Sequence, residues 1–249
     1  MTSALKIYKN NINNLNSITL AFPSSYYLTN PSKILPLAAG QSKTLSYLCN
    51  ESGKWAYYKS DRFGFRNKDK LWNQEVDIVS VGDSFLHGYC VNEGENISEV
   101  FNKKSNYKML NLGVGGTGPL HQYARLKEYL KSVKKFDYIF WFYYEGNDLA
   151  NLDLEFNNDI LKKYLSENFS QNLIFKQNEI DELTKKDLNK NFLQRTYTLS
   201  KFIKLDTIKW SIAVLYNNKF NNNVKNFKVN KKQLEKLNDV LKKVKIMAN

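Results

Sequence analysis

Three short apolar runs, each followed by small or polar residues, alternate with helix-like segments between residues 76 and 148. The runs are "VDIVSVG", "YKMLNLGV" and "FDYIFWFYY". Apolar runs of this length are typical of buried strands, and strands that alternate with helices form parallel sheets with right-handed crossovers. The sequence therefore predicts an α/β fold in which the carboxyl ends of the strands meet at one edge of the sheet.

The segments around these strands predict the rest of the architecture. "PLHQYARLKEYLKSVKK" predicts a helix with Pro119 in its first turn. Its apolar face is formed by Leu120, Tyr123, Leu126 and Leu130. A further helix is expected late in "SFLHGYCVNEGENISEVFNKK".

The domain organisation follows from changes in composition along the chain. Residues 1–70 hold three of the four prolines and are expected to be an irregular N-terminal arm, and residues 71–249 form the α/β domain. Residues 149–230 are polar, asparagine-rich and long for a connection, so we expect a helical insertion or lid. Its expected packing positions are Leu161, Tyr164, Leu165, Ile180 and Leu183. The tail is expected to be an amphipathic helix packed through Leu234, Leu237, Leu241 and Val244.

The net charge of +13 raises the question of an anionic partner, such as nucleic acid or a membrane surface. Nearly all of this charge is lysine, because the only arginines are Arg62, Arg66, Arg125 and Arg195. Arginine is the preferred residue for bidentate phosphate recognition, and the lysines are scattered rather than gathered into one basic arm. The composition therefore favours a chain with no nucleic-acid partner.

Cysteine, histidine and hydropathy exclude further classes. Cys49 and Cys90 are the only cysteines; they make no disulfide framework, and we expect both to be buried or half-buried. With two histidines and two distant cysteines, a zinc cluster is not expected, and no other metal or cofactor motif is visible. No run approaches the ~18 apolar residues of a membrane helix, and the N-terminus does not resemble a signal peptide. At face value we expect a cytoplasmic chain with no membrane segment.

Residues suited to acyl transfer follow each of the three strands. "GDSF" holds Ser84, "NLGVGGTG" holds a run of glycines, and "EGND" holds Asn147. A serine at a strand-to-helix turn lies near backbone N–H groups, and a glycine lets another N–H approach closely. An asparagine amide is a neutral donor for a developing oxyanion. The three strand ends therefore predict a nucleophile beside an oxyanion hole.

In order and spacing, "GDSF", "NLGVGGTG" and "GND" resemble the motif blocks of the SGNH (GDSL-type) hydrolases. "SDRFGFRN" resembles the lead-in seen in SGNH-type proteins of bacterial glycan-acylation systems. The resemblance implies a flavodoxin-like three-layer α/β/α fold and hydrolysis or transfer of acyl or O-acetyl esters, with a small-molecule or glycan ester as substrate. It implies that Ser84 is the nucleophile and also donates its own N–H. Gly116 and Asn147 would complete the oxyanion hole, with Gly115 as the alternative glycine.

One family feature has no counterpart here: a histidine near the C-terminus, preceded three residues earlier by aspartate. His87 and His121 could approach Ser84, but each also suits an ordinary polar or capping position. We expect this chain to be a fragment, with its sheet incomplete at the C-terminus. The alternative is a non-catalytic SGNH-like module that binds a carbohydrate or acyl group.

A third hypothesis comes from Gly113, Gly115 and Gly118, which spell the G-x-G-x-x-G outline of a dinucleotide-binding loop. Such a loop normally follows the first strand and places a pyrophosphate at a helix N-terminus. Here the glycines follow the second strand, and Pro119 removes one N–H donor. The nucleotide hypothesis also leaves "GDSF" and "GND" unexplained, so it ranks below the oxyanion hypothesis. The sequence does not indicate an oligomeric state.

Overall fold

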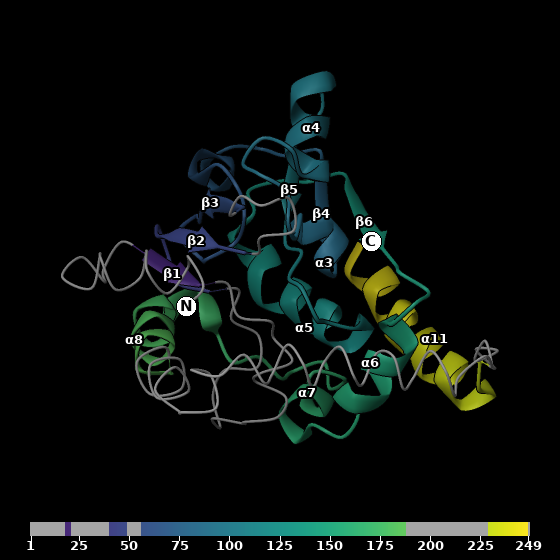
Figure 1. The fold of residues 1–249 in the computed structure, drawn as a ribbon. Helices are drawn as coiled ribbons and strands as arrows, with labels where there is room; N and C mark the ends of the chain where they lie inside the picture. The colour runs from purple at the N-terminus through teal and green to yellow at the C-terminus, as the bar shows by residue number, and fades with distance from the viewer. Residues whose placement is uncertain (1–17, 21–39, 49–55, 188–228, 249) are drawn as a thin grey trace, which may run out of the picture.

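The computed structural model describes residues 18–20, 40–48, 56–187 and 229–248. The central sheet consists of three parallel strands, β4 (Ile78–Gly82), β5 (Met109–Asn111) and β6 (Tyr138–Phe142), in the order β5-β4-β6. Ile78 of β4 lies opposite both Met109 and Tyr138, so the three strands start in register. The predicted mixed α/β class and parallel sheet are confirmed (Figure 1).

Helices occupy the connections between and after these strands. In chain order they are α3 (Ser84–His87), α4 (Ile97–Lys104), α5 (Pro119–Tyr129), α6 (Asp148–Glu155), α7 (Asp159–Lys163), α8 (Gln177–Asp187) and α11 (Lys231–Ala248). Short 3₁₀ helices span η2 (Asp69–Asn73), η3 (Leu130–Ser132) and η4 (Leu173–Phe175). Local sequence explains several boundaries. Pro119 occupies the first turn of α5, and Asn96 caps α4 by accepting a hydrogen bond from the Glu99 N–H.

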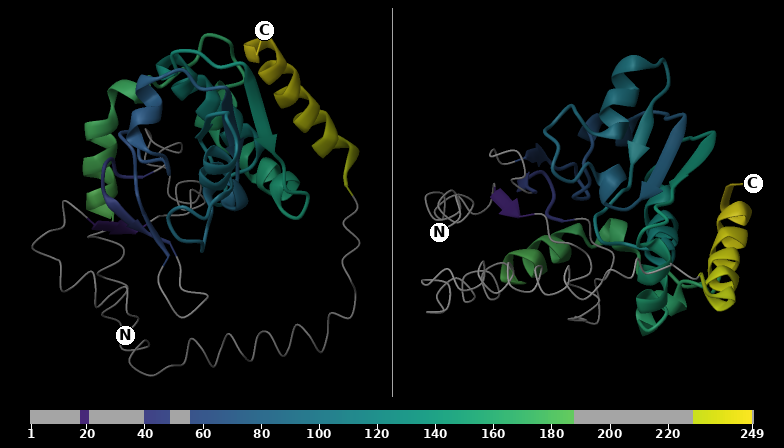
Figure 2. Two further views of the ribbon diagram at one scale, coloured as in Figure 1. Left: turned by 90° about the horizontal axis from the view of Figure 1, so that it is seen from above. Right: turned by 45° about the vertical axis from the view of Figure 1, so that its right-hand side comes forward.

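The main hydrophobic core lies around β4, β5 and α5. Leu120, Leu126 and Tyr123 of the predicted α5 face are buried, and Leu130 packs against the same core, as expected. Helices α6 and α11 both contact α5, and Figure 2 shows α11 running beside the α5–α6 region. The core therefore fixes the direction of α5 and α6, whose first residues follow the ends of β5 and β6.

The N-terminal region contains more regular structure than the predicted irregular arm. A second sheet joins β1 (Ile18–Leu20), β2 (Leu45–Tyr47) and β3 (Tyr57–Lys59), with β1 parallel to β2 and β2 antiparallel to β3. The start of "KWAYYKSDRFGFRN" predicts a strand, and the structure has β3 there. Strands β1 and β2 have only three residues each, which is too short for a periodic pattern to be detected in the sequence.

Residues 149–187 of the expected helical insertion contain α6, α7 and α8, which are joined by turns and by the short η4. Residues 188–230 of that prediction lie almost wholly outside the described residues. The expected packing positions are confirmed: Leu161, Tyr164 and Ile180 are fully buried, and Leu165 and Leu183 pack against the core.

The prediction for the tail helix was partly wrong. Leu237 and Val244 pack as expected, but Leu234 and Leu241 are 51% and 44% exposed. Val240 is fully buried instead. The buried stripe is rotated toward Val240 because that face of α11 meets α5 and α6.

Strand β6 forms one edge of the central sheet, and its side chains alternate between two environments. Ile139 and Trp141 pack against the core, while Tyr138 and Phe140 are 60% and 40% exposed. Among the described helices, none is both long enough and apolar enough to cross a membrane.

Candidate functional site

The structure brings the ends of the three strands together around Ser84. A Cβ added to Gly115 in the loop after β5 would lie 3.6 Å from the Ser84 Cβ. On the other side, the Phe85 ring lies 4.7 Å from the ring of Tyr144, which follows β6. Because β4 is the central strand, Ser84 is flanked by residues from both neighbouring strand ends.

Ser84 is the first residue of α3 and is half-buried. Asp83 caps this helix by accepting a hydrogen bond from the Phe85 N–H at 3.0 Å. The Ser84 hydroxyl contacts the Asp83 carboxylate at 3.4 Å, which is long for an O–H···O bond. Gly88 ends the helix in the left-handed conformation, at φ 73°. As the first residue of a helix, Ser84 also has a backbone N–H with no acceptor inside that helix.

The glycine loop distinguishes between the two candidate oxyanion glycines. The Gly115 N–H donates to Nδ1 of His87 at 3.2 Å, so this amide points into the protein. Gly116 is half-buried and has φ 75°, a conformation that favours glycine. Of the two amides, Gly116 remains the better candidate for a donor beside Ser84.

Asn147 occupies the N-cap position of α6, but its side chain makes no capping hydrogen bond and carries an unsatisfied polar atom. Its side-chain oxygen is buried and has no hydrogen-bond partner among the described residues. Buried polar groups are normally hydrogen-bonded, so this oxygen is an exception among the described residues.

Asp148 adds a buried carboxyl group next to Asn147. One of its oxygens accepts the Tyr144 N–H at 2.8 Å, while the other has no partner among the described residues. Burial, followed by the nearby charge of Asp83, raises the pKa of Asp148 to about 7. Because Gly82 of β4 pairs with Phe142 of β6, the ends of these two strands lie side by side.

Neither histidine contacts the Ser84 hydroxyl in the hydrogen bonds of the described residues. His87 is 3% exposed and uses Nδ1 for Gly115 and Nε2 for the Tyr58 hydroxyl, 3.2 Å away. His121 is fully buried in α5, with Nδ1 3.9 Å from the Glu155 carboxylate. Both side chains are therefore part of the protein interior, and they are more buried than the ordinary polar or capping residues expected from the sequence.

The N-terminus of α5 is occupied by a carboxyl group of this chain. The buried Glu155 side chain accepts hydrogen bonds from the N–H groups of Gly118 at 2.6 Å, Leu120 at 3.0 Å and His121 at 3.3 Å. A Cβ on Gly118 would approach Glu155 to 2.9 Å. These are the amides that a pyrophosphate would need, so the arrangement argues against the nucleotide hypothesis. Sequence patterns missed Glu155 because it lies 37 residues from Gly118.

The "SDRFGFRN" segment supports the site through hydrogen bonds to β5, a role that the motif alone did not reveal. The buried Asp61 carboxylate accepts the N–H groups of Phe63 and Phe65, the Asn67 amide and the Trp72 indole N–H. Asn67 in turn pairs with the backbone of Asn111 in β5, through bonds of 2.8 Å in both directions. This segment therefore positions β5 and the loop that follows it.

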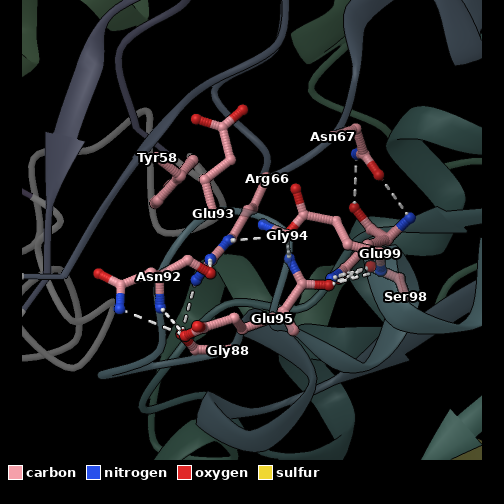
Figure 3. Close-up of polar contacts among 12 residues, drawn as sticks. Tyr58, Arg66, Asn67, Gly88, Asn92, Glu93, Gly94, Glu95, Ser98 and Glu99 are labelled. Carbon is pink, nitrogen blue, oxygen red and sulfur yellow. Dashed lines mark hydrogen bonds and ion pairs between the residues drawn. The ribbon is translucent and has the colours of Figure 1, made fainter. Parts of the chain in front are cut away.

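Arg66, from the same segment, holds the loop that follows α3 (Figure 3). Its guanidinium donates to the carbonyl oxygens of Gly88 at 2.6 Å and Asn92 at 2.5 Å, and its Nε lies 3.7 Å from the Glu99 carboxylate. The side chain is 1% exposed and stacks over the Tyr58 ring at 5.2 Å. These contacts fix the end of the helix that begins with Ser84.

The hydrogen bonds to the Asp61 carboxylate predict that two tryptophan substitutions lower the unfolding free energy by different amounts. Trp72→Phe removes the indole N–H that donates to Asp61 at 2.7 Å, and we expect a loss of about 1–2 kcal/mol of unfolding free energy. Trp141→Phe is the matched control, because the Trp141 Nε1 has no partner among the described residues. Urea unfolding of both variants checks this. An equal or larger loss for Trp141→Phe would contradict it.

Cys90 is half-buried, as expected, and is disulfide-bonded, so its thiol is not free. Cys49 lies outside the described residues. In the described part of the chain, no group of three or more histidine, cysteine, aspartate or glutamate side chains could hold a metal ion.

No protein-family model, curated protein or solved structure matches the chain.

Proposed function

We propose that this chain carries the nucleophile and oxyanion hole of an SGNH-like serine hydrolase that acts on acyl esters, with a small-molecule or glycan ester as substrate. The observation that carries the proposal is the meeting of Ser84, the glycine loop and the residues that follow β6 at one sheet edge, where the Asn147 side-chain oxygen is buried without a partner among the described residues. The order β5-β4-β6 supports a flavodoxin-like fold, in which the first strand of this unit lies between the second and third.

In the proposed reaction, the Ser84 Oγ attacks the ester carbonyl carbon and the carbonyl oxygen becomes an oxyanion. The Ser84 N–H, the Gly116 N–H and the Asn147 amide stabilise this charge. Collapse of the intermediate breaks the bond to the leaving oxygen, which takes up the proton lost by Ser84 and departs as the alcohol, and the acyl group stays on Ser84. Water then hydrolyses this new ester to the carboxylic acid and restores the serine hydroxyl. The Ser84 hydroxyl donates toward the Asp83 carboxylate, and the two oxygens lie 3.4 Å apart. That distance is beyond the range of an efficient general base. We therefore expect slow turnover by this chain.

Acetyl transfer from p-nitrophenyl acetate tests the proposal. After incubation, peptide mass spectrometry is expected to find one acetyl group on the peptide that contains Ser84, and none on that peptide in Ser84→Ala. Ser166→Ala, at an exposed serine, serves as the control and is expected to behave like the wild type. Acetylation of other residues with none on Ser84 would overturn the esterase proposal.

A non-catalytic module that binds an acyl or carbohydrate group is the second candidate. It is favoured by the interior positions of His87 and His121, which leave Ser84 without an imidazole contact in the hydrogen bonds of the described residues. A chain that binds an acyl ester but never acetylates Ser84 would support this candidate over the first.

A further inference from the structure

His87 connects the helix of the proposed nucleophile to the glycine loop. It lies three residues after Ser84 in α3, and its Nδ1 accepts the Gly115 N–H at 3.2 Å. Its Nε2 contacts the Tyr58 hydroxyl of β3, also at 3.2 Å, and the two rings meet edge to face at 5.6 Å. A Cβ on Gly113 would lie 2.8 Å from the His87 backbone nitrogen, so the loop packs tightly against this helix.

The contacts of His87 determine its protonation state. A backbone N–H can only donate, so Nδ1 must present a lone pair to Gly115, and the ring hydrogen lies on Nε2, toward Tyr58. Burial, with smaller effects from Arg66 and Arg125, lowers the pKa of His87 to about 3. A protonated ring would turn an N–H toward the Gly115 N–H. The neutral ring is therefore the form that this geometry requires.

We propose that His87 is a positioning residue: its Nδ1 holds the Gly115 N–H toward the interior and thereby leaves the next amide, that of Gly116, free to face the oxyanion beside Ser84. This inference rests on the proposed function. It assigns His87 a task other than that of a base, since both ring nitrogens already have partners within the protein.

Two substitutions of similar shape isolate the bond to Gly115. His87→Asn places an amide oxygen near the position of Nδ1, whereas His87→Leu has nearly the same outline and no acceptor. Both lose the contact with Tyr58, so the difference between them reports the Gly115 bond alone. Tyr58→Phe completes the set, because it removes the partner of Nε2 and leaves the Gly115 bond in place.

The first measurement is hydrogen exchange at the Gly115 amide, which does not depend on activity. We expect exchange to be about tenfold faster in His87→Leu than in His87→Asn, with Tyr58→Phe close to the wild type. Equal exchange in the two His87 variants would overturn the inference. If a His87 variant does not fold, rapid exchange at Gly115 in folded Tyr58→Phe, with the neighbouring amides unchanged, would overturn it.

The second measurement is the rate of Ser84 acetylation by p-nitrophenyl acetate. We expect His87→Leu to lower the maximal rate about tenfold with little change in the half-saturating ester concentration, and His87→Asn to restore most of it. We also expect the acetylation rate to depend on pH between pH 6 and 7 in the same way in the wild type and in His87→Asn, because His87 is neutral throughout this range. A wild-type protein without Ser84 acetylation would defeat the proposed function, whereas a difference in Gly115 exchange would still support the bond.

Discussion

Asn147→Leu is expected to lower the rate of Ser84 acetylation by about 10²–10³-fold, the usual effect of removing one oxyanion donor. Leucine preserves the approximate shape of the side chain but cannot donate a hydrogen bond. Because the Asn147 side-chain oxygen is buried without a partner among the described residues, the same change is expected to leave the unfolding temperature unchanged or to raise it.

Acetylation kinetics and thermal unfolding, measured on the same samples, check both parts of this prediction. Asn157→Leu is the control, because it makes the same chemical change at an exposed position after α6. A variant that loses both activity and stability would show that Asn147 acts mainly in folding. A variant that keeps full activity would remove Asn147 from the oxyanion hole.

Glu155→Ala is expected to cost about 3–5 kcal/mol of unfolding free energy, because it leaves three backbone N–H groups at the start of α5 without their acceptor. For a domain of this size that corresponds to a fall in unfolding temperature of about 10 °C. Glu155→Gln keeps the shape and one acceptor oxygen, so its loss is expected to be smaller. A loss below about 1 kcal/mol in Glu155→Ala would contradict the role of this carboxyl group as the hydrogen-bond acceptor that anchors the start of α5.

The same residue predicts an unusual pH dependence. Burial raises the pKa of Glu155 to about 8, and burial also raises the pKa of Asp148 to about 7 and of Asp61 to about 6. Each of these groups binds a proton in the folded protein that the unfolded chain has already released, so stability falls as pH rises toward the folded pKa. Burial lowers the pKa of His87 from 6.5 to about 3, so this residue makes stability rise with pH instead. Its effect is confined to pH values below 6.5.

Between pH 6.5 and pH 8 the buried carboxyl groups therefore determine the slope. Glu155 alone is expected to remove about 2 kcal/mol of stability over this range. Thermal unfolding at both pH values checks this, and Glu155→Gln is expected to flatten most of the decline. Wild-type stability that rises over this range would show that Glu155 is ionised in the folded protein.

The sequence was informative where the relevant signal is local. The three strands, the buried face of α5 and the turn at Pro119 follow from spacing and from residue type, and the structure confirms them. Ser84, Gly116 and Asn147 could be assigned to one edge because parallel strands end on the same side of a sheet. Their roles in catalysis stay predictions.

The rest depends on contacts between residues far apart in the chain. Glu155 reaches Gly118 across 37 residues, and Asn67 pairs with Asn111 across 44 residues, with no pattern that announces either contact. His87 lies in a four-residue helix, and its partner Gly115 is 28 residues away. The predicted buried face of α11 was partly wrong for a related reason. Its sequence allows two neighbouring stripes of apolar residues to be buried, and contact with α5 and α6 selects the stripe that contains Val240.

The close approach of Gly118 to α6 has a consequence for sequence variation. A methyl group at position 118 would come within 2.8 Å of the Asn151 Cβ and 2.9 Å of a Glu155 oxygen. The Leu152 backbone nitrogen would also lie only 2.9 Å away, so a shorter side chain at position 155 could not by itself make room. Any natural variant that carries alanine at position 118 should therefore hold α6 farther from the start of α5, and the residues between these two helices are expected to change with it.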